Sequence, residues 1–166
     1  MTDTMTAEQR HRCMAQIRSR DTKPETLVRH YLYARGFRYR KNVRTLPGTP
    51  DIVLGRFHTA IFVDGCFWHG HEGCRYFRLP KTNTAFWQQK IDRNRERDAA
   101  NRLELRREGW HVIRVWECQL KPDVRMQTLR SIEQALCGIY LDDNGVERHG
   151  GTAIAAEEET PYGTTE

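Results

Sequence analysis

The spacing of hydrophobic residues near the start of the chain predicts two helices. Residues 23–35 repeat apolar side chains every three to four positions, as an amphipathic helix does, and Gly36 can end that helix in a left-handed conformation. Its apolar face is formed by Leu27, Val28, Tyr31 and Leu32. Residues 22–25 (Thr-Lys-Pro-Glu) and 6–9 (Thr-Ala-Glu-Gln) each have the sequence of a capping box. Each box therefore marks the start of one helix.

Four other segments have the patterns of β-strands. Residues 37–40 alternate apolar and polar side chains, as a half-buried strand does. Residues 51–55 and 60–64 are short apolar runs separated by four residues, which predicts a β-hairpin. Residues 110–116 are a further apolar run and predict a buried strand.

Two more helices complete the expected fold. Residues 84–108 are polar and helix-forming, and residues 123–137 carry an apolar face. That face consists of Met126, Leu129, Ile132 and Leu136. The order of elements predicts a mixed β-sheet flanked by helices, of the α/β (α+β) class, in a single domain over residues 1–137. Residues 138–166 are rich in Gly, Thr and Glu, and we expect an acidic, disordered tail.

Charge is distributed unevenly between these two parts. The whole chain carries +5, but residues 138–166 carry −6, which leaves +11 on residues 1–137. So basic a body favours nucleic acid as the partner over a merely soluble basic surface, because Lys and Arg neutralise phosphates. No apolar run approaches the ~18 residues of a membrane span, and the N-terminus is polar. We therefore expect a soluble, cytoplasmic protein that associates with the nucleoid and has no membrane partner.

The predicted hairpin brings two carboxylates to its open end. If the loop is symmetric about residues 57 and 58, Asp51 lies opposite Asp64 with their Cβ atoms about 5 Å apart. Two like charges so close repel each other unless a cation or a proton lies between them. Carboxylate oxygens suit Mg²⁺, which can activate water against a phosphodiester. The alternative is that both acids end their strands in solvent.

Ligands suited to a softer metal follow the hairpin. The five candidates are Cys66, His69, His71, Cys74 and Cys118. Five cysteines without an export signal indicate a metal site, and structural zinc takes four Cys and His ligands. Three cysteines and one histidine would leave the other histidine free, beside the carboxylates, as a general base. The alternative is exposed histidines and buried cysteines, and such packing is the interpretation we favour for Cys13 and Cys137.

Aromatic residues stand beside these ligands. Phe67 and Trp68 are large apolar side chains in a loop, where they would not normally be left in solvent. Such residues can wedge between base pairs and unstack a step at a cost of about a few kcal/mol. Trp87, Met14 and Ile17 are further candidates for this contact, and core packing is the alternative for each.

Four sequence blocks, residues 20–25, 46–51, 61–71 and 114–118, closely resemble the very short patch repair endonucleases. The most specific part is Gly-Cys-Phe-Trp-His at residues 65–69. The resemblance implies a restriction-endonuclease-like fold and a strand nick on the 5′ side of the T in a T:G mismatch, which arises when 5-methylcytosine deaminates. It also implies double-stranded DNA as the substrate and other mismatch-repair proteins as partners. We expect a monomer.

The resemblance further implies roles for individual residues in catalysis. Asp51 becomes the main Mg²⁺ ligand, with help from the backbone carbonyl of Val63 and from Glu25 through water. His69 becomes the base that prepares water for attack. A catalytic role for Asp64 rests on the hairpin argument alone, because the best-known family member has Thr and His where this chain has Val63 and Asp64. Glu25 also has a structural explanation as the third residue of the capping box.

The remaining implied roles concern zinc and DNA. The zinc ligands would be Cys66, His71, Cys74 and Cys118. Phe67, Trp68 and Trp87 would enter the DNA from the major-groove side, and Met14 and Ile17, on a DNA-contacting helix within residues 1–21, would lie near the minor groove. Two other functions stay open: a zinc-stabilised DNA-binding module without catalysis, and a related nicking nuclease with a different target.

Overall fold

The computed structural model describes residues 6, 8, 9, 12 and 20–145. Its helices and strands, in chain order, are α2 (Lys23–Ala34), β1 (Arg40–Lys41), β2 (Ile52–Leu54), β3 (Thr59–Asp64), α3 (Thr84–Arg107), β4 (His111–Trp116) and α4 (Arg125–Asp143). Two short 3₁₀ helices, η1 (Gly55–Phe57) and η2 (Glu117–Leu120), follow β2 and β4. No described helix is long and apolar enough to span a membrane.

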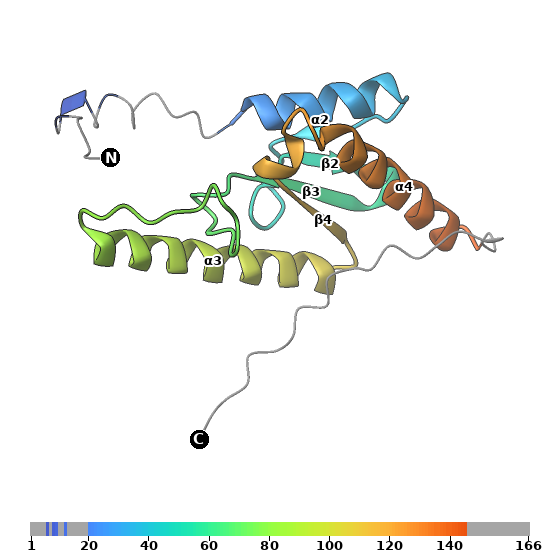
Figure 1. The fold of residues 1–166 in the computed structure, drawn as a ribbon. Coiled ribbons are helices and arrows are strands. Elements are labelled where there is room, and N and C mark those ends of the chain that lie inside the picture. The colour runs from blue at the N-terminus through green and yellow to red at the C-terminus, as the bar shows by residue number, and fades with distance from the viewer. Residues whose placement is uncertain (1–5, 7, 10–11, 13–19, 146–166) are drawn as a thin grey trace.

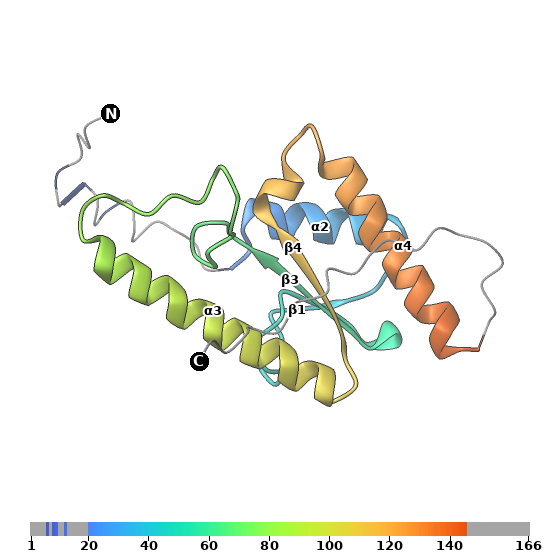
Figure 2. The same cartoon turned by 60° about the horizontal axis from the view of Figure 1, so that its bottom comes forward.

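The four strands form one mixed sheet in the order β1-β2-β3-β4. The first three pair antiparallel, whereas β3 and β4 are parallel. Parallel neighbours need a long crossover connection, and the segment that contains α3 supplies it. Figures 1 and 2 show α3 on one face of the sheet and α2 with α4 on the other. The predicted mixed sheet flanked by helices is thus confirmed.

The main core lies between the sheet and the α2–α4 face. It contains Val28 and Leu32 from α2, Ile52, Leu54, Ile61, Val63 and Val115 from the sheet, and Leu129, Ile132 and Leu136 from α4. The other face of the sheet is covered more thinly. Of the 24 residues of α3, only Ile91, Arg102 and Leu105 are buried. Most of α3 is therefore a solvated helix with a narrow packed stripe.

Local signals define both ends of α2. Thr22 is its N-cap and accepts a hydrogen bond from the Glu25 N–H, as the capping box predicts. At the other end, Gly36 has φ +88° and its N–H bonds to Tyr33, while the Phe37 N–H bonds to Leu32. These are the two hydrogen bonds of a Schellman motif. The predicted capping box at Thr6 is also present, with both of its hydrogen bonds to Gln9.

Two predicted boundaries are wrong. The strand predicted at residues 37–40 is limited to Arg40–Lys41, because Phe37 is used to close α2 and packs in the core. The last helix continues to Asp143 instead of ending at Cys137. Tyr140 explains this extension, since its ring packs 5.7 Å from that of Phe57 and extends the apolar face by one turn. Residues 146–166 of the expected tail lie outside the described residues.

The hairpin forms, but its register differs from the predicted one. Ile52 pairs with Ile61 and Leu54 with Thr59, so the register is shifted by two residues and Asp51 does not lie opposite Asp64. The cause is the loop, which turns through η1 and then His58 at φ +45°. A shift of two residues leaves every side chain on its predicted face.

The loop between β3 and α3 is fastened to α3 through its backbone. Asn94 donates to the Trp68 carbonyl at 2.9 Å, and Arg95 donates to the Gly70 carbonyl at 3.0 Å. Gly70 itself lies against the helix, with φ +62°. A Cβ atom there would approach the Ile91 Cγ2 to 2.6 Å. The backbone of the loop therefore packs closely against side chains of α3.

Replacing Gly70 with Ala should weaken this contact more than the same change at Gly73. Both glycines have positive φ, but a Cβ at Gly73 would meet nothing within 4 Å. We expect Gly73→Ala to cost about 1 kcal/mol of unfolding free energy and Gly70→Ala roughly 2–4 kcal/mol, because overpacking adds to the backbone strain. Chemical denaturation of the two variants measures the difference. Equal losses would contradict the close packing of Gly70.

Candidate active site and metal centre

A cleft of about 920 Å³ opens where the start of α2, the end of β3, the following loop and α3 meet. Five carboxylates line it: Glu25, Asp51, Asp64, Asp98 and Glu117. The imidazole of His69 also lines it, and basic side chains of Arg20, Lys90, Arg97 and Arg102 contribute to its walls. The structure thus brings Glu25, Asp51, Asp64 and His69, all predicted from the sequence, into one cleft.

Asp51 stands at the end of the hairpin. The β2–β3 ladder ends at the Ile52–Ile61 pair, and the Asp51 carboxylate accepts the Val63 N–H at 2.7 Å. In a strand, the N–H and C=O of one residue point to the same neighbour, so the Val63 carbonyl also points to this edge. The pKa of Asp51 is raised to about 7, because burial and the charges of Glu25 and Asp64 outweigh the hydrogen bond from Val63 and the charge of Arg29. The carboxylate is therefore costly to ionise where it lies.

Three hydrogen-bond donors hold the carboxylate of Glu25 at the wall of the cleft. Its carboxylate accepts hydrogen bonds from the Asp21 N–H at 2.9 Å, the Thr22 hydroxyl at 2.8 Å and the Arg29 guanidinium at 3.0 Å. The side chain is only 4% exposed. Since a carboxylate has about four lone-pair positions, one remains for a further donor. Glu25 is thus held rigidly at the cleft wall.

His69 is held by a partner that the sequence did not indicate. Its Nδ1 contacts the carboxylate of Asp98 on α3, and its Nε2 lies 3.8 Å from Asp64 Oδ1. Burial lowers the pKa of His69, but the hydrogen bond to Asp98 and the charges of Asp64 and Asp98 outweigh it and raise the pKa above its ordinary value. The histidine is therefore oriented by one carboxylate and lies near a second.

Asp98 could have been found from the helical spacing. It lies seven positions after the buried Ile91 and seven before the buried Leu105, on the same stripe of α3. An acid at a position that faces the fold needs a partner, because buried charges are paired. This signal points to Asp98 but not to His69 as its partner.

Asp64 pairs with a second residue that the sequence did not indicate. Arg114 Nε donates to Asp64 Oδ2 at 2.6 Å, and the Arg114 guanidinium lies 3.7 Å from the centre of the Trp116 ring. Asp64 thus lies in the cleft with Asp51, as predicted. However, its charge is compensated by Arg114, and it does not stand directly opposite Asp51 across a shared cation.

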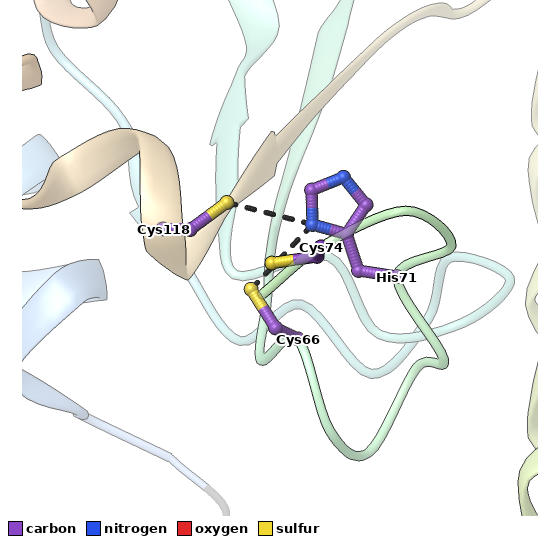
Figure 3. Close-up of side chains that lie close together, drawn as sticks. All are labelled: Cys66, His71, Cys74 and Cys118. Atoms are coloured by element: carbon purple, nitrogen blue, oxygen red, sulfur yellow. Dashed lines mark hydrogen bonds between the residues drawn. The ribbon is translucent and has the colours of Figure 1, made fainter. Parts of the chain in front are cut away.

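Cys66, His71 and Cys74 of the loop and Cys118 of η2 converge on one point, as Figure 3 shows. The ligand atoms of Cys66, His71, Cys74 and Cys118 all lie within 4.8 Å of one another, an arrangement that could hold a metal ion. His71 Nδ1 is 3.6 Å from the Cys66 sulfur and 3.4 Å from the Cys118 sulfur. Burial raises the pKa of the Cys66 thiol to about 12. The structure therefore groups four of the five candidate ligands and leaves out His69, which contacts Asp98.

The aromatic residues form a cluster beside this loop. The ring of Phe67 lies 5.2 Å from that of Trp68 and 5.4 Å from that of Trp87, and the Lys90 ammonium lies 5.5 Å from the Trp68 ring. All three rings are only partly buried. Core packing therefore does not account for them fully. Met14 and Ile17 lie outside the described residues.

The other cysteines differ in what can be said of them. Cys137, predicted to pack in the interior, is exposed on α4, because the helix turns it away from the apolar face of Leu129, Ile132 and Leu136. Cys13 lies outside the described residues.

Comparison with known proteins agrees with this geometry. The family model described as DNA mismatch endonuclease Vsr matches residues 2–75. The chain is 36% identical to the DNA mismatch endonuclease Vsr of Escherichia coli over 153 residues, which cover 88% of this chain and 97% of that protein. It is 51% identical to the type II nicking enzyme V.NmeAIP of Neisseria meningitidis over 121 residues, which cover 73% of this chain and 86% of that one.

A third relative gives a similar result. The type II nicking enzyme V.XorIIP of Xanthomonas oryzae is 48% identical over 120 residues, which cover 72% of this chain and 88% of that protein. The mixed sheet and its flanking helices agree with the restriction-endonuclease-like fold that the sequence resemblance implied. The chain therefore belongs to the Vsr family of DNA mismatch endonucleases.

Proposed function

We propose that this protein nicks one strand of duplex DNA on the 5′ side of the T in a T:G mismatch, with Mg²⁺ as its cofactor. One observation carries the proposal: a single cleft holds Asp51, Glu25 and Asp64 together with the His69–Asp98 pair. Carboxylates for a hard cation and an oriented histidine are the two parts that metal-assisted phosphodiester hydrolysis needs.

The residues around Asp51 fit a magnesium ion. The pKa of Asp51 is raised to about 7, by burial first and then by the charges of Glu25 and Asp64, so a bound cation would make this carboxylate easier to ionise. Asp51 and the Val63 carbonyl would hold the ion directly, and Glu25, with three donors already bound, would act through water. When bound, Mg²⁺ would supply positive charge that activates water and stabilises the charge developing on the scissile phosphate.

His69 is proposed to accept the proton of the attacking water. Because Asp98 engages Nδ1, the neutral imidazole carries its free lone pair on Nε2, which lies at the Asp64 side of the cleft. Asp98 orients the ring, and the carboxylate of Asp64 would stabilise the imidazolium that forms. Asp64 thus contributes charge to catalysis while Arg114 keeps it in place.

A structural zinc ion is proposed for the cluster of Cys66, His71, Cys74 and Cys118. A tetrahedral zinc at ordinary bond lengths separates sulfur and nitrogen ligands by roughly 3.6 Å, close to the observed 3.4 and 3.6 Å. Burial raises the pKa of the Cys66 thiol and of the Cys118 thiol, so these two would be costly to ionise without a cation. Zinc would hold the loop that carries His69 toward the cleft.

The aromatic cluster is proposed to meet the DNA. Phe67, Trp68 and Trp87 would enter from the major-groove side, and Met14 and Ile17 would contact the minor groove. Rings that are partly exposed beside a catalytic cleft suit insertion at a weakened base step. The protein would act as a monomer in the cytoplasm, with other mismatch-repair proteins as candidate partners.

A second candidate target follows from the relatives. The N. meningitidis and X. oryzae proteins carry the name type II nicking enzyme, so the same cleft chemistry could serve another recognised site. A DNA-binding module without catalysis is less well supported, because the relatives are named as enzymes that cut DNA.

The first prediction concerns the nick itself. Incubation with Mg²⁺ should convert a duplex with one T:G pair into a single product cut 5′ of the T, and Asp51→Asn and His69→Ala should each lower the rate at least about 100-fold. His58→Ala serves as control, because His58 stacks on Trp110 at the opposite end of the hairpin and should stay within twofold of wild type. Labelling each strand separately identifies the cut. Equal cutting of a matched duplex would refute the mismatch target, and no cutting of any duplex would refute the whole proposal.

The second prediction concerns the charge of Asp51. Its pKa is raised to about 7 in the folded chain, so without metal the fold loses stability as the pH rises from about 4 toward 7. Asp51→Asn removes this loss and should raise the melting temperature at pH 8 by roughly 4 °C or more. Mg²⁺ should stabilise the wild type but not the variant. Thermal unfolding with and without Mg²⁺ tests this, and an identical Mg²⁺ response in both proteins would exclude Asp51 as a ligand.

The third prediction concerns zinc. Elemental analysis should find about one zinc per chain, and Cys118→Ala should lose it together with several kcal/mol of stability, because structural zinc contributes its binding energy to folding. Cys137→Ala is the matched control, since Cys137 is an exposed thiol outside the cluster. Full zinc content in the Cys118 variant would show that the cluster is not the site.

A further inference from the structure

Arg29 joins three segments of the cleft wall and has no role in the resemblance to the family. Its guanidinium pairs with the carboxylate of Asp21, donates to Glu25 Oε2 at 3.0 Å and donates to the main-chain carbonyl of Asp51 at 3.1 Å. The side chain is 6% exposed, although it carries a full positive charge. A buried arginine with this set of partners fixes the positions of all three.

For Glu25, the contact with Arg29 completes a rigid cradle. The other two donors, the Asp21 N–H and the Thr22 hydroxyl, belong to the turn in front of α2. Arg29 follows one helical turn after Glu25 and approaches Oε2 from the helix. Without the Arg29 contact, Glu25 Oε2 would keep only the hydrogen bond from the Asp21 N–H, and the carboxylate could rotate into the cleft.

Arg29 contacts the main-chain carbonyl of Asp51, whereas Val63 contacts its carboxylate. The Val63 N–H fixes the carboxylate at 2.7 Å, and the Arg29 Nη2 fixes the carbonyl of the same residue. One nitrogen of a planar guanidinium thus contacts both Glu25 and Asp51. The Asp51 carbonyl also accepts the Asn42 N–H at 3.3 Å, so Arg29 links Glu25 to a carbonyl that the backbone already holds, and its planar guanidinium fixes how the Glu25 carboxylate lies relative to it.

The charge of Arg29 has a separate consequence. Arg114 neutralises Asp64 and His69 faces Asp98, so Arg29 is the positive partner of the Glu25–Asp51 side of the cleft. A cation that binds there is attracted by the same carboxylates and repelled by the guanidinium. Removal of the Arg29 charge should therefore strengthen cation binding. Loss of its hydrogen bonds should at the same time leave Glu25 and Asp51 less firmly positioned.

We propose that Arg29 is a positioning residue for strand nicking, which aligns Glu25 and Asp51 for the chemical step and at the same time weakens the binding of Mg²⁺. The proposal rests on the Mg²⁺-dependent nicking proposed above. A residue with a merely structural role would lower stability, cation affinity and rate together. A positioning residue of this kind changes affinity and rate in opposite directions.

The test compares Arg29→Met, Arg29→Lys and the control Arg35→Met. Arg35 is the C-cap residue of α2, 51% exposed, and paired with Glu133. Titration calorimetry of the free protein with Mg²⁺ alone gives the affinity, single-turnover nicking at saturating Mg²⁺ gives the rate, and thermal unfolding gives the folded fraction. For Arg29→Met we expect a rate 10- to 100-fold lower, as about 1 Å of misplacement can cause, and Mg²⁺ binding roughly three- to tenfold tighter.

The lysine variant separates charge from shape. Arg29→Lys keeps the charge but lacks the planar fork, so Mg²⁺ affinity should stay within about twofold of wild type while the rate still falls roughly tenfold. Arg35→Met should change neither quantity more than twofold. Should Arg29→Met fail to fold, the lysine variant alone decides the geometric part.

Three results would overturn the proposal. They are a rate for Arg29→Lys equal to wild type, Mg²⁺ binding by a folded Arg29→Met variant that is unchanged or weaker, and a rate loss fully explained by the unfolded fraction. Absence of nicking by the wild-type chain would instead refute the proposed function. In that case the calorimetric comparison still tests the effect of the Arg29 charge on the cleft.

Discussion

Five carboxylates share one cleft, and the compensation of their charge decides how the surrounding residues are arranged. Glu25 is paired with Arg29, Asp64 with Arg114, Asp98 with His69, and Glu117 with Lys121. Among the described residues, Asp51 is the cleft carboxylate without an ion-pair partner, and its pKa is raised to about 7, by burial first and then by the charges of Glu25 and Asp64. Since an uncompensated buried charge is costly, a cation held by Asp51 and the Val63 carbonyl, as proposed above, would lower that cost. Each paired carboxylate in turn fixes the side chain that pairs with it.

The long helix α3 connects this cleft to the Cys/His cluster. Its packed stripe is largely polar, so it is held by hydrogen bonds to the loop more than by apolar burial. Asn94, Arg95 and Asp98, within about one turn, contact the Trp68 carbonyl, the Gly70 carbonyl and the His69 ring. The aromatic cluster, His69 and the loop of the proposed zinc site are therefore joined to α3, and we expect DNA contacts at Trp68 or Lys90 to affect the position of His69.

Features that depend on nearby residues in the chain could be predicted from the sequence, whereas features that depend on tertiary contacts could not. Helix α2 was predictable because its cap, its apolar face and its final glycine are all local signals. The faces of the hairpin followed from alternation, but its register did not, because it depends on the left-handed conformation of His58. In the site, counting ligands left one histidine over, and the structure indeed separates His69 from the other four residues. Asp98 and Arg114 were missed because their partners lie on other elements, which no spacing in the sequence reveals. Arg29 has Glu25 one helical turn before it, but its contact with the Asp51 carbonyl is tertiary and has no local signal.

The Cys/His cluster and the cleft are linked in two ways. Asp64 and Cys66 are near neighbours in the sequence, and the pairing of β3 with β4 adds a second link. Its register pairs Asp64 with Trp116 and Phe62 with Arg114, so all four side chains point to one face. Arg114 can therefore bind Asp64 while its guanidinium lies on the Trp116 ring, and that ring stacks on His71 at 4.0 Å. A slip of one residue would turn Arg114 and Trp116 to the opposite face and separate both contacts at once. The hairpin register lies two residues from the expected one and still leaves every side chain on its predicted face, although it moves Asp51 away from Asp64. The register of β3 and β4 has the larger effect, because both the contact of Arg114 with Asp64 and the stacking of Trp116 on His71, a proposed zinc ligand, depend on it.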